Sequence, residues 1–134
     1  MADAVKPSVK RGAALVEMAI TLLLLLLLTF ALMEYGWLFL KIHQVSDAAR
    51  QGARLAILPD STNADVENRV QSAMTAAGLG ASGYTITLTP ATNVGDPVSV
   101  DIDVLYSNIA LTQVPLVPVP VHIHASVCMA KEGP

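Results

Sequence analysis

Two pairs of polar side chains have the types and spacing that could bind a metal ion. His122 and His124 are two residues apart in a β-like stretch, as are Asp101 and Asp103 in another, so each pair lies on one face of its strand. Imidazole and carboxylate groups are zinc ligands, and adjacent strands would bring the pairs together. The same alternation is typical of the solvated face of a sheet. We favour that interpretation and predict no metal and no cofactor.

No other residues have a spacing that indicates catalysis. The single cysteine, Cys128, cannot form an internal disulfide. We expect it to be a small buried hydrophobic residue, with intermolecular pairing or reactivity as the alternatives. The sequence has no glycine-rich phosphate loop and no cysteines spaced for a metal. A net charge of -3 without a basic block argues against nucleic-acid binding. The expected protein is therefore not an enzyme and has no small-molecule substrate.

The most informative charged side chain is Glu17, about one turn into an apolar run from Gly12 to Leu40 whose only other charge is Glu34. At about 1.5 Å per residue, this run can cross a bilayer as a helix. A charge at the bilayer centre costs about 2.5 to 3.5 kcal/mol on insertion scales. Glu17 is therefore either an interfacial glutamate that reaches the head groups or the partner of a positive group in a helix assembly. If the chain were cut after Gly12, the new α-amine of Ala13 on a neighbouring copy could be that group.

The leader, residues 1–12, is short, polar and basic through Lys6, Lys10 and Arg11. Basic residues before a first membrane segment tend to stay in the cytoplasm. We therefore expect a cytoplasmic N-terminus and an extracytoplasmic chain after Leu40. A cleavable secretory signal also begins with basic residues, but this apolar run is longer than a usual signal core and has no convincing small-x-small cleavage site.

Three motifs resemble those of one known family. Residues 11–18, RGAALVEM, are similar to a class III prepilin-type cleavage signal, with a basic residue, glycine, a cut, and glutamate at the fifth mature position. Residues 34–36, EYG, resemble the acidic-aromatic-glycine pattern that ends the membrane segment of TadE-like proteins. Residues 48–54, AARQGAR, resemble the alanine-arginine-glycine-arginine stretch of the same proteins. The chain thus resembles the TadE-like pseudopilins of Tad/Flp pilus assembly.

The resemblance implies a bacterial inner-membrane protein that a prepilin peptidase cuts between Gly12 and Ala13. It also implies that Glu17 sets helix register against other pilins or pseudopilins and the Tad assembly platform. Met18 stands where an aromatic residue is usual, and the run lacks the family's proline, which implies a straighter helix. The further candidate partner contacts are Glu34, Tyr35, Arg50 and Arg54. For the two arginines, a solvated face near the membrane is the alternative.

The residues before Pro59 predict one long helix, from about Ala13 to about Leu58. Residues 13–35 would span the membrane, and residues 36–58 would continue outside it with an apolar stripe at spacings of three and four. A second helix is predicted over residues 60–79. It would begin in the cap-forming cluster of residues 60–63 and end near Gly78 and Gly80.

Three later segments, residues 84–89, 98–104 and 121–127, alternate between apolar and polar residues. They predict an antiparallel sheet of about three strands with one buried face. Three prolines within residues 111–120 indicate an extended connector or an edge strand. The predicted fold class is α+β: a long N-terminal transmembrane helix that continues into a small pilin-like head, with residues 59–134 forming the head.

The expected function is that of a minor pseudopilin, cut after Gly12, in the assembly or initiation of a Tad/Flp-type pilus or a related secretion machine. Incorporation into an extracellular pilus is left open. One alternative is the major filament subunit, although major Flp pilins are usually much shorter. Others are a single-pass anchored extracytoplasmic binding module whose leader is never cut, and a secreted domain released by signal peptidase.

Overall fold

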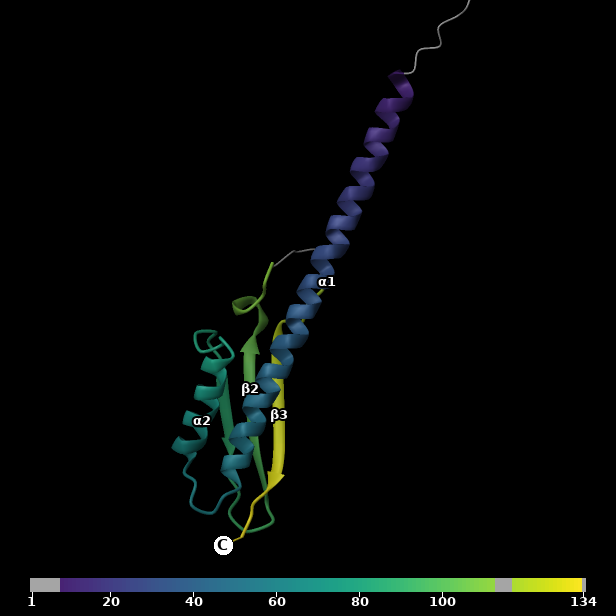
Figure 1. Ribbon diagram of the computed structural model, residues 1–134. Helices are drawn as coiled ribbons and strands as arrows, with labels where there is room; N and C mark the ends of the chain where they lie inside the picture. Colours follow the sequence, from purple (N-terminus) through teal and green to yellow (C-terminus); the bar gives the residue numbers. More distant parts are fainter. Residues whose placement is uncertain (1–7, 113–116, 134) are drawn as a thin grey trace, which may run out of the picture.

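The computed structural model describes residues 8–112 and 117–133, with side chains from Gly12 onward (Figure 1). Its elements are α1 (Ser8–Ala56), α2 (Asn63–Ala76), β1 (Thr85–Thr89), β2 (Pro97–Leu105), the short 3-10 helix η1 (Tyr106–Asn108) and β3 (His122–Ala130). Lys6 of the leader and Pro115 of the connector lie outside the described residues, as do the side chains of Lys10 and Arg11.

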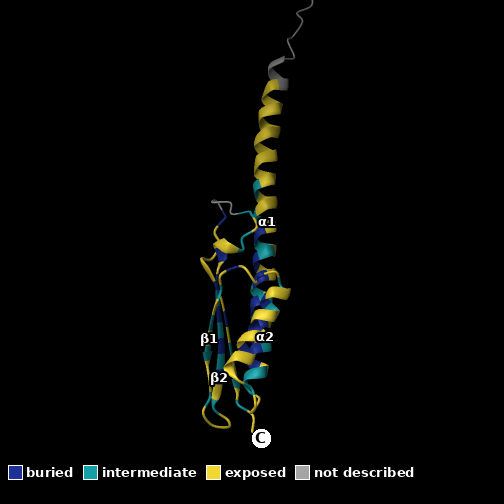
Figure 2. Cartoon of the chain, turned by 90° about the vertical axis from the view of Figure 1, so that its left-hand side faces the viewer, coloured by how far each residue is buried: buried dark blue, intermediate teal, exposed yellow. Residues whose placement is uncertain are grey.

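Helix α1 is a single helix of 49 residues with two different surfaces. Its large apolar side chains are mostly exposed between Leu15 and Met33, whereas beyond Glu34 one side of the helix is buried by the rest of the chain (Figure 2). The stretch Gly12–Ala56 is long and apolar enough to cross a membrane. The prediction of one long helix with an apolar first half is therefore confirmed.

The ends of α1 differ slightly from the prediction. The helix begins at Ser8 and not near Ala13, because no residue between them stops it and a glycine inside a helix costs only about 1 kcal/mol. It ends at Ala56 and not at Leu58, because the residue before a proline is disfavoured in helical conformation and Pro59 follows.

The second helix begins inside the predicted cluster of cap residues. Thr62 is the N-cap: its hydroxyl accepts a hydrogen bond from the Asp65 backbone N–H, and the Asp65 carboxylate accepts one from the Thr62 backbone N–H at 3.0 Å. This reciprocal pair satisfies two helix-terminal donors. The helix ends at Ala76, before the predicted residue 79, and Gly78 follows with a positive φ of 70°.

The three strands form one antiparallel sheet in the order β1-β2-β3, as predicted. Both helices lie on the same side of this sheet (Figure 2). The apolar residues of β2, among them Val100, Ile102 and Val104, are fully buried against the helices together with Val45 and Met74. The α+β class is therefore confirmed, and the described residues of the proline-rich connector contain no strand.

Two expectations about β3 are wrong. Val121 is 69% exposed because the strand begins only at His122, so the alternation does not reach Val121. Cys128 is exposed, not buried, because β3 extends to Ala130 and the residue shares the strand face of His122. The strand's own alternation could have placed this cysteine on the open face.

Candidate functional site

The predicted cleavage site, Gly12 and Ala13, lies within α1 and is exposed. A Cβ atom added to Gly12 would meet no atom within 4 Å. The packing of the described chain therefore does not require glycine at this position. Any requirement for glycine would come from another protein that binds this part of the helix.

Glu17 is exposed on the apolar half of α1, in a shallow groove lined by Ala14, Met18, Thr21 and Leu22, among others. The Thr21 hydroxyl donates to the Glu17 backbone carbonyl at 2.9 Å, as expected for a threonine in an apolar helix. Within the described part of the chain, the Glu17 carboxylate has no hydrogen-bond or ion-pair partner. Among the described residues, the carboxylate is therefore available to a positive group on another molecule.

Glu34 is only 1% exposed and is held by the chain's own head. Its carboxylate accepts hydrogen bonds from the Tyr106 hydroxyl at 2.5 Å, and from the Thr112 backbone N–H and hydroxyl at 2.9 and 2.5 Å. The Leu111 N–H is a fourth, longer donor at 3.4 Å. A contact of this carboxylate with a partner protein would require these bonds to break. Burial, followed by the Glu34 hydrogen bond, raises the pKa of the Tyr106 hydroxyl.

Two aromatic side chains of α1 hold the same part of the head. The Tyr35 hydroxyl donates to the Pro118 carbonyl at 2.8 Å, and the Trp37 ring N–H donates to the Ile109 carbonyl at 2.7 Å. We call residues 109–112 and 117–121 the junction loop, because they bind α1 where its exposed apolar half meets the head. Sequence reasoning did not find these contacts, since 72 to 83 residues separate the partners.

Lys41 joins the two helices one turn further along α1. It is 6% exposed, and its ammonium group donates to the Ala77 carbonyl at 3.0 Å and to the Gln44 side chain at 2.9 Å. It also lies 4.6 Å from the centre of the Trp37 ring, within the range of a cation–π contact. Burial lowers the pKa of this lysine. The contact with Ala77 places a positive charge at the C-terminal end of α2, where it is favourable.

The AARQGAR stretch divides into a packed face and an exposed face. Ala49 and Ala53 are fully buried, and a Cβ atom on Gly52 would lie 2.5 Å from a methyl group of Val70. The small residues thus allow α1 and α2 to approach closely. Arg50 and Arg54 are exposed, and the described partner of Arg50 is Asp47 at 3.4 Å, a surface pair that contributes little.

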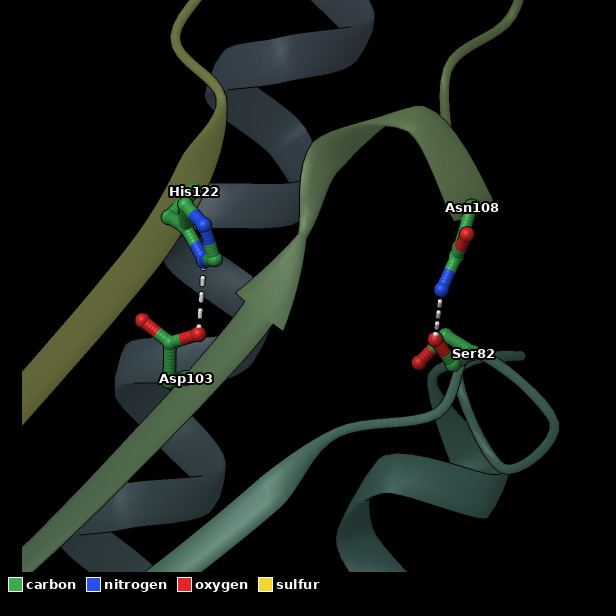
Figure 3. Close-up of polar contacts among 4 residues, drawn as sticks. All are labelled: Ser82, Asp103, Asn108 and His122. Carbon is green, nitrogen blue, oxygen red and sulfur yellow. Dashed lines mark hydrogen bonds and ion pairs between the residues drawn. The ribbon is translucent and has the colours of Figure 1, made fainter.

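The four residues weighed as metal ligands form two separate pairs on the sheet face away from the helices. His122 Nδ1 lies 2.8 Å from Asp103 Oδ1, and His124 Nε2 lies 3.8 Å from Asp101 Oδ1. Figure 3 shows the first pair bridging β2 and β3. Over residues 8–112 and 117–133, no group of three or more His, Cys, Asp and Glu side chains is placed to hold a metal ion.

A second contact in Figure 3 anchors the start of the junction loop. The Asn108 side-chain amide donates to the Ser82 carbonyl at 2.8 Å, which ties η1 to the turn after α2. Together with the Tyr106 bond to Glu34, this contact fixes both ends of η1. The junction loop therefore leaves the sheet from a well-held position.

Comparison with known proteins agrees with the motifs of the membrane half. The model of the TadE-like protein family matches residues 12–54, which confirms the resemblance over the length of α1 that carries all three motifs. No curated protein and no solved structure matches the chain. The match supports a Tad pilus-associated protein, and the long apolar helix fits a membrane anchor.

Proposed function

We propose that this chain, whose residues 12–54 match the TadE-like family, is a minor pseudopilin of a Tad/Flp-type pilus or a related secretion machine. A prepilin peptidase cuts it between Gly12 and Ala13, and the mature protein acts in pilus assembly or initiation. The observation that carries the proposal is the exposed apolar half of α1, on which Glu17 has no partner within the described chain. The position of Glu17 matches the family's cleavage signal.

Cleavage supplies the positive group that Glu17 needs. After the cut, the new α-amine lies on Ala13, at the very start of the apolar helix. In a low-dielectric environment, the attraction between this amine on one helix and Glu17 on its neighbour is much stronger than in water. A carboxylate left unpaired there is costly, so the pair discriminates between registers.

The apolar surface around Glu17 cannot set this register alone. Residues 22–28 are all leucine, so a neighbouring helix could slide along them with little change in contact. A single charge pair at one position along the helix favours one register over the others. The register of the helix also fixes the position of the head, because the Glu34 bonds and the Trp37 contact attach the head to α1.

In this proposal, the protein sits in the bacterial inner membrane with a cytoplasmic leader and an extracytoplasmic head. Its partners are the peptidase, other pilins or pseudopilins, and the Tad assembly platform. Arg50 and Arg54 are candidate contacts with these partners because both are exposed on the outer side of α1.

The test is the N-terminus of the membrane-extracted protein from its own host, measured by intact mass and sequencing. We expect a chain that begins at Ala13, and an unprocessed, membrane-held precursor for Gly12→Val. Gly36→Val is the matched control, since a Cβ atom at either glycine meets nothing within 4 Å. A normal mature N-terminus in Gly12→Val would refute the cleavage. An intact leader in a host with an active peptidase would favour the anchored binding module instead.

A further inference from the structure

The junction loop has no charged side chain and exposes several apolar ones. Between Asp103 and His122 the sequence contains no Asp, Glu, Lys or Arg. Leu111 is 43% exposed, Val119 38% and Val121 69%. At the opposite end of the head, by contrast, charged residues adjoin the β1–β2 connection, where the Lys131 backbone N–H donates to the Asp96 carbonyl.

The junction loop lies at the end of the head from which the exposed apolar half of α1 projects (Figure 1). Its two described arms contact α1 at Glu34, Tyr35 and Trp37. A hydrocarbon core of about 30 Å takes up about 20 helical residues. The proposed membrane span, residues 13–35, is about this long and ends at Tyr35. The contacts of the junction loop therefore fall at the outer boundary of the bilayer.

Four polar backbone groups of the junction loop are hydrogen-bonded to side chains of α1. The N–H groups of Leu111 and Thr112 donate to Glu34, and the carbonyls of Ile109 and Pro118 accept from Trp37 and Tyr35. Pro118 and Pro120 have no N–H group to satisfy. Irregular backbone is tolerated near hydrocarbon where its polar groups have partners, and the four groups that face α1 meet that condition.

We propose that the junction loop inserts its exposed apolar side chains into the outer interfacial layer of the phospholipid bilayer, as a second membrane contact besides α1. The inference rests on the proposed function only in that α1 spans the membrane. Tyr35 and Trp37, which hold the loop, are of the residue types enriched at this depth. Because the loop has no basic side chains, the contact depends on apolar burial and not on anionic lipid.

Two membrane contacts would fix the head in a way that one helix cannot. A single helix leaves the head free to rotate about the helix axis relative to the bilayer surface. The junction loop projects to one side of α1, so its insertion restricts the tilt of α1 relative to the bilayer. The face of the head that meets a neighbouring subunit would thereby be oriented before assembly.

The test uses the full chain with Cys128→Ser, reconstituted in vesicles of neutral phosphatidylcholine. Single cysteines at Val121, Val94 or Leu25 carry an environment-sensitive fluorophore, and lipids with a nitroxide near the head group or deep in the acyl chain act as quenchers. Val94 is the matched control because it is an exposed valine, at 62%, in the β1–β2 connection at the far end of the head.

We expect the shallow nitroxide to quench the Val121→Cys label several-fold more than the Val94→Cys label, and the deep nitroxide to quench the Leu25→Cys label. Equal, weak quenching at positions 121 and 94 with strong quenching at 25 would overturn the inference and leave the anchoring helix intact. Absence of deep quenching at position 25 would overturn the membrane span itself, and the inference with it. A second label at Leu111→Cys must report the same shallow depth as Val121→Cys.

Discussion

Neutralising Glu34 is expected to destabilise the attachment of the head to α1. In Glu34→Gln, the side chain keeps one carbonyl oxygen but loses its charge. It also directs an NH₂ group toward some of the present donors, which are the Tyr106 hydroxyl, the Leu111 N–H and the two donating groups of Thr112. A hydrogen bond to a charged group contributes about 1.5 to 3 kcal/mol. Because the site is buried, a lost bond is not replaced by water.

The expected loss for Glu34→Gln is about 2 to 4 kcal/mol in the free energy of unfolding, since one or two of these bonds become neutral or are lost. Glu34→Ala should lose more, because it leaves all of the donors without an acceptor. The exposed Glu67, on α2, provides the control: Glu67→Gln should stay within about 0.5 kcal/mol of the wild type.

The assay is denaturant unfolding of the full chain in detergent micelles, followed by tryptophan fluorescence. Trp37 is the single tryptophan and contacts the junction loop through the Ile109 carbonyl, so its emission reports on the attachment directly. A double-mutant cycle with Tyr106→Phe should give a coupling of about 1 to 2 kcal/mol with Glu34→Gln. Unchanged stability of Glu34→Gln, or a coupling near zero, would show that the carboxylate does not hold the head as we describe.

Three further predictions concern other parts of the chain. Gly52→Ala should destabilise the head by about 1 to 3 kcal/mol through overpacking against α2, whereas Gly36→Ala, which meets no atom within 4 Å, should be neutral or slightly stabilising in the same unfolding assay. The hydrogen bonds from Thr62 lower the pKa of Asp65, so the stability difference between wild type and Asp65→Asn should be constant above the ordinary Asp pKa. That difference should vanish as pH falls through the lowered pKa, and a difference that grows on acidification would contradict the capping box. Glu17→Gln should leave the mature N-terminus unchanged but abolish assembly of pili on cells, and normal piliation would rule out a register-setting charge.

The elements of this fold follow from local patterns in the sequence. A run of apolar residues as long as Gly12 to Leu40 can hardly be anything but a membrane-length helix, and strict alternation in three segments fixes which strand faces are buried. The cleavage motif and the stretch around Glu17 are also local, so they could be found without a structure. For the same reason the family match covers residues 12–54, where these local motifs lie.

The tertiary structure decided what the polar residues at the junction do. From the sequence, Glu34 is only a candidate partner contact at the end of an apolar run. Its donors Tyr106 and Thr112 lie 72 and 78 residues away, so no local pattern could identify them. Gly52 lies in the stretch that resembles a family motif, yet only the approach of α2 shows why a side chain would not fit there. Hydrogen bonds and close packing between distant segments depend on how the elements dock, and docking is a property of the assembled core and not of any local stretch.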